Sequence, residues 1–389
     1  MTHGRPDLPD ERYGQRLDAA RWLAREAHLE ALLIGVGADL RYLTGYVAMP
    51  LERLTMLVIP ADGPFVLLAP RLELLPARGC PAARSGRVEV VAWEETEDPI
   101  ARVADLVRGN AGPGGTLSPI AISDRLPAAF LLALQAALPG VSWQLASSVL
   151  RRLRMIKDAD EIALLRMAAH AADRVILAIA AGSLVGRTEA DIAREVTERL
   201  VAEGHDSAEF AIVASGPESA SPHHEPSDRV VRPGEPIILD IGGPLGGYGS
   251  DTTRTIWVTG GDPSRGPDPL FRRIYALVAT ARREAAAAVR PGVEAQSIDA
   301  VARQVIAAGG HGDQFIHRVG HGIGLEGHED PYLVAGNTEP LQIGMAFSIE
   351  PGIYLEGRYG VRIEDIVVCG PAGADVLDEV THDLLIVDG

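Results

Sequence analysis

Two aspartates interrupt apolar, strand-like segments in the second half of the chain. Asp240 follows three aliphatic residues in PIILDIG, and Asp251 opens DTTRTIWV eleven positions later. Both segments are rich in β-branched residues, and the glycine-rich GGPLGGYGS between them is typical of a turn. The pattern predicts a β-hairpin with one carboxylate on each arm.

Two glutamates repeat this feature near the C-terminus. Glu350 ends AFSIE just before Pro351-Gly352, and Glu364 lies inside VRIEDIVV. A single Asp or Glu in such a segment usually lies at a strand end and faces water. Four carboxylates in apolar strands are a different case, because each one costs several kcal/mol unless it is paired or bound to a metal ion. Since few cationic residues lie nearby, the four carboxylates favour a shared divalent cation.

A histidine-rich segment adds a nitrogen ligand to this set. His321 lies in VGHGIGLEGHE, where alternating glycines allow backbone and ligand to approach closely, and His317 and His328 flank it. One imidazole with four carboxylates suits Mn²⁺ or another hard divalent ion rather than a cysteine-rich zinc site. Five ligands are too many for one tetrahedral ion and are natural for two ions bridged by carboxylates.

The elements that must position these residues differ between the two halves of the chain. A helix is predicted over Arg12–Ala27, followed by strand-like segments with amphipathic segments between them, which indicates an α/β domain. The strand-like segments read ALLIGV, TMLVIP, PFVLLA, VEVVAW and PIAIS, and NAGPGG at 110–115 is predicted to be a loop. A boundary falls where RRLRMIK meets DADE, so we expect domains over 1–152 and 153–389.

The second domain uses one pattern twice. The segments 186–205 and 292–311 are both twenty residues long, open with Gly and close with Gly-His. Each is predicted to be a helix that is followed by extended segments with glycines between them. The pattern indicates an internal duplication.

Composition and charge exclude several classes of protein. The chain has 389 residues, a formal net charge of −17 and two cysteines, and its longest apolar stretches are shorter than the roughly 20 residues that cross a bilayer. Nucleic acids are bound by clustered Lys and Arg, which this acidic chain lacks. We therefore expect no nucleic-acid partner and no membrane partner. The opening MTHGRPDLPD has no apolar targeting segment, so the cytoplasm is the expected location.

Several catalytic motifs are absent. Lys157 is the only lysine and no glycine-rich run precedes it, which excludes a Walker A phosphate loop. Neither G-x-S-x-G nor H-E-x-x-H occurs. The segment 322–327 fits the dinucleotide pattern G-x-G-x-x-G, but it follows HRVGH rather than an apolar strand, which disfavours that interpretation.

Five separated motifs follow one another in the order D-x-G, S-D-x-T-R-T, G-H-G-I-G, I-E-P-G-x-Y and R-x-E-D. This order resembles the Xaa-Pro peptidases, the prolidase and aminopeptidase P group with the pita-bread catalytic fold. LRYLTGY in the first half also looks like the N-terminal domain of that group. The resemblance implies an α/β N-terminal domain and an α+β pita-bread catalytic domain with an internal pseudo-two-fold repeat.

The resemblance also implies two divalent metal ions per chain, with Mn²⁺ expected and Co²⁺ or Zn²⁺ as alternatives. Asp240 and Asp251 would bind the first ion. The second ion would be bound by Asp251, His321, Glu350 and Glu364, and Asp251 and Glu364 would bridge the pair. Glu350 would also accept the proton of the attacking water and deliver it to the leaving nitrogen.

Other residues match positions of the family that contact the substrate or orient ligands. His223 in SASPHHEPSD matches a substrate-side histidine, and the adjacent His224 is the alternative register. The remaining matches are His317, His328, Tyr354 and Arg362. Arg362 is a candidate partner for a substrate carboxylate, or it is held by a ligand carboxylate instead.

The leading interpretation is a dinuclear metallopeptidase that cleaves dipeptides before proline. One alternative is an exopeptidase of the aminopeptidase P type, because the subtype depends on how the mouth of the site is closed. A second is the hydrolysis of a non-peptide amide such as ectoine on the same scaffold. A third, a non-catalytic binding protein, has no reason to keep all five ligands. The expected partners are a proline-containing peptide and a second copy of the chain in a homodimer.

Overall fold

The computed structural model describes residues 8–110 and 118–389. The chain divides into two compact units, one that ends at Arg154 and one that extends from Met155 to Gly389. Of the loop predicted at 110–115, Asn110 instead ends a helix, and the remaining five residues lie outside the described part of the chain, as do the first seven residues of the protein. Within the described residues, we find no helix that is both long and apolar enough to span a membrane.

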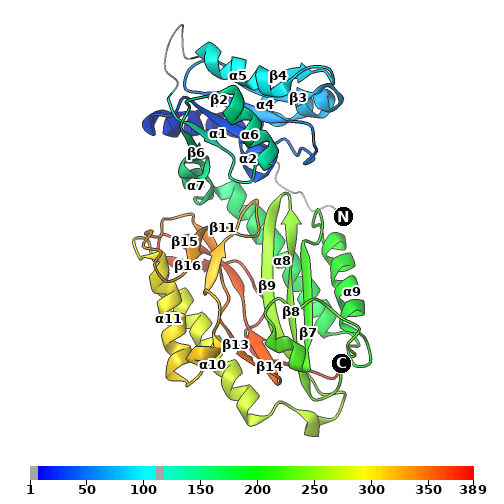
Figure 1. The fold of residues 1–389 in the computed structure, drawn as a ribbon. Coiled ribbons are helices and arrows are strands. Elements are labelled where there is room, and N and C mark those ends of the chain that lie inside the picture. The colour runs from blue at the N-terminus through cyan, green and yellow to red at the C-terminus, as the bar shows by residue number, and fades with distance from the viewer. Residues whose placement is uncertain (1–7, 111–117) are drawn as a thin grey trace. The chain divides into compact units, whose positions relative to one another are not determined.

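The N-terminal unit is a six-stranded sheet with helices around it (Figure 1). Its strands are β1 (Ala31–Gly35), β2 (Met56–Pro60), β3 (Phe65–Pro70), β4 (Val88–Trp93), β5 (Ile120–Ile122) and β6 (Trp143–Leu145), in the order β4-β3-β2-β1-β5-β6. Its helices are α1 (Asp10–Glu26), α2 (Ala38–Thr44), α3 (Leu74–Gly79), α4 (Pro81–Arg84), α5 (Pro99–Asn110), α6 (Ala128–Ala137) and α7 (Ser147–Arg154). Apolar runs form the central strands because these are buried on both faces. The α/β domain predicted from the sequence is confirmed.

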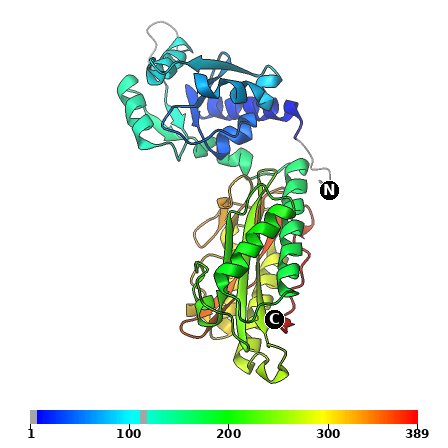
Figure 2. The ribbon, with the colours of Figure 1, turned by 90° about the vertical axis from the view of Figure 1, so that its right-hand side faces the viewer.

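The C-terminal unit begins with two helices that cover a four-stranded sheet. The helices are α8 (Ala159–Ala180) and α9 (Glu189–Ala202), and the strands are β7 (Phe210–Ser215), β8 (Glu235–Leu245), β9 (Tyr248–Val258) and β17 (Leu385–Val387). Asp158 and Glu161 form a capping box at the start of α8, which explains why the helix begins there. Figure 2 shows the two green helices against one face of the sheet, and their apolar sides share a core with β8 and β9.

A second pair of helices covers the remaining strands of this unit (Figure 1). The helices are α10 (Pro269–Ala288) and α11 (Ala295–Ala308). The strands are β10 (Gly320–Gly322), β11 (Glu329–Leu333), β12 (Ala346–Ile349), β15 (Asp365–Gly370) and β16 (Gly373–Val376), with β13 (Gly352–Leu355) and β14 (Tyr359–Arg362) paired separately. Asp268 caps α10, and Pro269 occupies its first turn.

The predicted internal duplication is visible in these two helix pairs. α9 and α11 both follow a glycine with positive φ, Gly186 at 84° and Gly292 at 88°. Each is preceded by a long helix and followed by strands that lead into the centre of the unit. The α+β arrangement with an internal repeat that was expected from the sequence is therefore present.

Candidate metal centre

The β8–β9 hairpin places two aspartates on one face of its sheet. The strands pair antiparallel, with Asp240 opposite Thr253 and Asp251 opposite Gly242. Residues two apart on a strand share a face, so Asp251 lies diagonally across from Asp240. The predicted hairpin with one carboxylate on each arm is confirmed.

The other three residues of the set come from the sheet of the second helix pair. His321 lies in β10, and Glu350 is the residue directly after β12. These strands can approach closely because residue 320 is glycine. A Cβ atom at this position would lie 1.9 Å from the carbonyl oxygen of Ser348. The sequence predicted that Glu364 lies inside a continuous strand, and the structure differs. Glu364 lies in the joint between β14 and β15, where its backbone N–H donates to the carbonyl oxygen of Thr253 at 3.1 Å.

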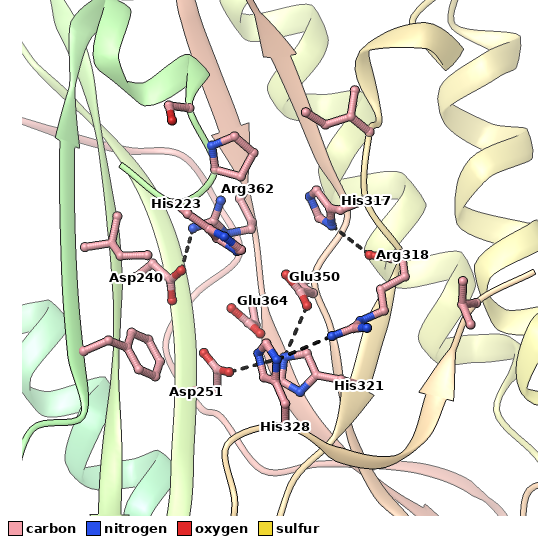
Figure 3. A pocket seen from close by; sticks show the side chains of 16 residues that line it. His223, Asp240, Asp251, His317, Arg318, His321, His328, Glu350, Arg362 and Glu364 are labelled. Atoms are coloured by element: carbon pink, nitrogen blue, oxygen red, sulfur yellow. Dashed lines mark hydrogen bonds and ion pairs between the residues drawn. The ribbon is translucent and has the colours of Figure 1, made fainter. Parts of the chain in front are cut away.

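All five side chains converge on one place (Figure 3). Ligand atoms of Asp240, Asp251 and Glu364 lie within 4.8 Å of one another, and so do those of His321, Glu350 and Glu364. The Nε2 atom of His321 lies 3.5 Å from Asp251 Oδ2 and 3.4 Å from Glu350 Oε1. Two overlapping groups that share Glu364 are the geometry expected for two neighbouring ions.

The electrostatics of this cluster fit divalent cations. Asp240, Asp251 and Glu364 are at most 7% exposed. Burial, together with the neighbouring carboxylates, raises the pKa of Asp251 and of Glu364 well above the usual value, and burial raises the pKa of Glu350 to about 8. Among the described residues, Asp240 Oδ1 and Glu364 Oε1 are buried oxygens without a hydrogen-bond partner. Oxygen atoms in this condition are suited to ligate a metal ion.

One cation already belongs to the cluster. Arg362 is 2% exposed, and its Nη2 donates to Asp240 Oδ2 at 2.5 Å. Its Nε donates to Thr253 Oγ1 at 3.2 Å and its Nη1 to the hydroxyl of Tyr354 at 2.9 Å. Thr253 in turn donates to Glu364 Oε2 at 2.6 Å. Arg362 is thus held by a ligand carboxylate, which was one of the two roles expected from the sequence.

A chain of hydrogen bonds runs from Arg362 to His317. The Nδ1 atom of His317 lies 2.7 Å from the carbonyl oxygen of Arg318, an acceptor, so Nδ1 carries the proton. Burial lowers the pKa of His317 to about 4, so the ring is neutral near pH 7 and its Nε2 is an acceptor. The hydroxyl of Tyr354 therefore donates to His317 Nε2 at 2.9 Å. Both ring nitrogens of His317 are engaged in this arrangement.

The two adjacent histidines of SASPHHEPSD have different surroundings. His223 is exposed and lines the same cavity as the metal-site carboxylates (Figure 3). The Nε2 atom of His224 lies 2.8 Å from Glu189 Oε2, and Glu189 is fully buried in α9. His224 belongs to a structural network outside the cavity, which the sequence pattern did not reveal.

A cavity of about 700 Å³ opens over the cluster. Its apolar walls are Phe210, Ile212, Ile316 and Val334. His328 lies at the mouth with its ring centroid 3.8 Å from that of His321, close enough to form a further possible ligand group with His321 and Asp251.

The sequence reasoning missed Arg318, which lines the same cavity. Its guanidinium stacks at 4.4 Å over the ring of Tyr332, and its Nη2 lies 3.4 Å from His328 Nδ1. The signal available in the sequence was its position directly after His317.

Comparisons with known proteins agree with this geometry. Residues 163–371 match metallopeptidase family M24, and residues 16–156 match the creatinase/prolidase N-terminal domain. The chain is 46% identical over 378 residues, 97% of both chains, to the probable dipeptidase PepE of Mycobacterium tuberculosis. It is 35% identical to an Xaa-Pro dipeptidase of Lactobacillus helveticus, over 94% of this chain and 97% of the relative. The crystal structure of a prolidase from Thermococcus sibiricus superimposes with a TM-score of 0.88 at 35% identity, over 99% of this chain and 100% of that one.

Proposed function

Because this chain belongs to metallopeptidase family M24, behind a creatinase/prolidase N-terminal domain, we propose that it is a metal-dependent dipeptidase that cleaves before proline. The family resemblance, the two-domain pita-bread fold and the peptidase class expected from the sequence are confirmed. The observation that carries the proposal is the convergence of five ligand side chains beneath an accessible cavity. The names of the relatives support proline as the substrate's second residue.

We propose two divalent ions as the cofactors, held as the family resemblance implies. Asp240 and Asp251 would hold the first, and His321 and Glu350 the second, with Asp251 and Glu364 shared. Support comes from the two unpartnered buried oxygens and from the raised carboxylate pKa values. The oxygen-rich ligands favour Mn²⁺, with Co²⁺ or Zn²⁺ as alternatives.

When bound, such ions supply Lewis acidity, which makes a water molecule acidic near neutral pH and polarises a carbonyl group. The remaining work falls to side chains. Glu350 lies beside His321, and in this proposal its ionised carboxylate accepts the proton of the attacking water and delivers it to the leaving nitrogen. His223 and His328 reach the same cavity and are placed to donate to the substrate carbonyl oxygen.

His317, Tyr354 and Arg362 have a different role in this proposal. His317 matches a family position that contacts the substrate or orients ligands, and here its Nδ1–H is used by a carbonyl oxygen and its Nε2 accepts from Tyr354. We assign the three residues to the orientation of Asp240 and of the cavity wall that carries His317.

Recognition of a dipeptide requires a partner for its free carboxylate. Arg318 and Arg362 are the two arginines that line the cavity, and Arg362 is already engaged with Asp240. Among the described residues, no carboxylate forms an ion pair with Arg318, and stacking on Tyr332 holds its guanidinium in place. We therefore assign this role to Arg318 rather than Arg362.

The decisive experiment compares substrates. Metal-stripped protein, reconstituted separately with Mn²⁺, Co²⁺ and Zn²⁺, is assayed with Ala-Pro, Ala-Ala, Ala-Pro-Ala and ectoine. We expect good turnover of Ala-Pro only. Preference for Ala-Pro-Ala would reassign the protein to the aminopeptidase P type, and ring opening of ectoine without peptide cleavage would overturn the peptidase substrate.

The carboxylate assignment has its own test. Arg318→Gln should raise KM for Ala-Pro by about tenfold, the loss of roughly 1.4 kcal/mol, and should leave the already weak turnover of Ala-Pro amide unchanged. Arg358→Gln is the matched control, since Arg358 also stacks on a tyrosine but lies outside the cavity. An equal effect of Arg318→Gln on both substrates would refute the assignment.

We also propose a homodimer in the cytoplasm, as expected from the sequence. Light scattering of the purified protein gives the number of subunits, and cell fractionation gives the location.

A further inference from the structure

The only lysine of the chain is buried in the C-terminal unit, where the proposed mechanism does not use it. The side chain of Lys157 is 1% exposed, and its Nζ lies 2.7 Å from Oε1 of Glu329, whose side chain is 7% exposed. Such a pair needs both partners, because removal of either one leaves an uncompensated buried charge. The ion pair therefore fixes the separation of the two segments that carry it.

Lys157 is anchored to the strand that leads to the metal ligand Glu350. Its backbone N–H donates to the carbonyl oxygen of Gly344 at 2.8 Å, and its neighbour Ile156 forms an antiparallel bridge with Met345. Met345 directly precedes β12, which ends one residue before Glu350. The lysine is thus held in place relative to the metal centre.

Glu329 lies at the other end of the ion pair, where a turn of six residues rejoins the sheet. Glu329 opens β11 and lies opposite Gly322 of β10. The turn at 323–328 therefore connects β10, which carries His321, to β11, and His328 is its last residue. The ion pair packs against the backbone of this turn. A Cβ atom at Gly324 would lie 2.5 Å from Glu329 Oε1 and 3.1 Å from Lys157 Cε.

The turn determines where the imidazole of His328 lies. His328 is the last residue of the turn and immediately precedes Glu329, and its ring lies 3.8 Å from that of His321 between centroids. The opposite end of the turn is held by β10 and by the bond from Gly249 N–H to the carbonyl oxygen of Gly324 at 2.9 Å. The end at His328 is joined to β11 and to the ion pair, and Arg318 Nη2 lies 3.4 Å from Nδ1 of the His328 ring.

We infer that Lys157 is a positioning residue that acts through His328: its ion pair with Glu329 fixes the end of the 323–328 turn and holds the His328 imidazole at the cavity. Lys157 is not one of the residues that line the cavity. Displacement of a catalytic group by about 1 Å costs up to a hundredfold in rate, so the effect of losing this ion pair is measurable in kcat.

A first experiment tests the ion pair without relying on the proposed function. Because the chain has one ε-amino group, acetylation at residue 157 is followed by mass spectrometry of the peptide that contains it. The folded protein should react at least a hundredfold more slowly than the same peptide in isolation, and Glu329→Gln should increase the rate about tenfold. Reaction of the wild type at the rate of the free peptide would overturn the inference.

A double-mutant cycle tests the action through His328 and rests on the proposed function. Lys157→Met should lower kcat for Ala-Pro about tenfold, leave KM within twofold and leave the metal content unchanged. In a His328→Ala background, Lys157→Met should lower kcat by less than twofold, because the group that it positions is gone. An equal tenfold loss in both backgrounds would show a general structural effect and overturn the inference.

Three variants keep this cycle interpretable. Lys157→Arg retains the charge and should restore at least half of the rate, and Glu329→Gln takes the place of Lys157→Met in the cycle if the latter fails to fold by circular dichroism. Arg166→Met is the control, since Arg166 forms an ion pair of the same 2.7 Å length with Asp375 outside the cavity. It should leave kcat unchanged in both backgrounds.

Discussion

Without metal, the protein should lose stability as pH rises through neutrality, and Glu350 provides the clearest test. Burial raises the pKa of Glu350 from 4.5 to about 8 in the folded, metal-free state. Between pH 6 and pH 8 the unfolded chain therefore has an ionised Glu350 while the folded chain still holds the proton. The folded state binds more protons in this window, so the free energy of unfolding must fall as pH increases.

The size of the effect follows from the width of the window. One proton held by the folded state alone changes the free energy of unfolding by about 1.4 kcal/mol per pH unit, so Glu350 contributes a loss of about 2 kcal/mol between pH 6 and pH 8. Buried His317 and His321, whose pKa values are lowered to about 4 and about 3, act in the opposite direction as pH falls below 6.5. A comparison with Glu350→Gln cancels these histidine contributions, because both proteins contain them.

The assay is urea unfolding of chelator-treated wild type and Glu350→Gln at pH 6 and pH 8. The wild type should lose about 2 kcal/mol more than the variant over this interval, or about 4–8 °C in Tm for a domain of this size. Saturating Mn²⁺ should abolish the difference in the wild type, because a bound cation keeps the carboxylate ionised. Parallel pH curves for the two metal-free proteins would refute the argument that buried Glu350 keeps its proton up to about pH 8.

Three further predictions concern individual side chains. Asp251→Ala should lower bound metal from two ions per chain to near zero by elemental analysis, because Asp251 belongs to both proposed ligand sets, and the loss of one ion with activity retained would contradict the bridging assignment. His223→Ala should keep its metal and lose about a hundredfold in kcat for Ala-Pro. His224→Ala should mainly lower Tm, because His224 contacts buried Glu189. Inactivation by His224→Ala alone, with Tm unchanged, would make His224 the substrate-side histidine instead of His223. Tyr354→Phe leaves Arg362 Nη1 and His317 Nε2 without their shared hydrogen-bond partner. The kcat should therefore fall about tenfold at unchanged metal content. An unaltered kcat would remove Tyr354 from the proposed site.

Local pattern was sufficient for much of the site. The hairpin with Asp240 on one arm and Asp251 on the other was predictable because two β-branched segments flank a glycine-rich turn. The helices α9 and α11 were predictable from the helical spacing of their apolar residues and from the glycines that flank them. In each case, the interactions that decide the structure lie within about twenty residues.

Roles that depend on distant partners could not be predicted in this way. The hydrogen bond at His317 Nε2 comes from Tyr354, 37 residues away, and the engagement of Arg362 depends on Asp240, 122 residues away. The break between β14 and β15 at Glu364 arises where its backbone bonds to Thr253, which no property of VRIEDIVV reveals. Adjacent His223 and His224 have identical chemistry, and only the position of Glu189 separates them.

The long separation between these partners bears on how the protein folds. Thr253 and Glu364, whose side chains meet beneath the metal centre, are 111 residues apart, so the chain must close a large loop before the two halves of the ligand set face each other. Folds dominated by such distant contacts form slowly, and the hairpin with Asp240 and Asp251 alone offers two carboxylates and no imidazole. In the proposed assignment, the hairpin carries two of the three ligands of the first ion, and Glu364 completes that set only after the loop closes. We therefore expect stable metal capture in a refolding experiment to accompany the end of folding rather than its beginning.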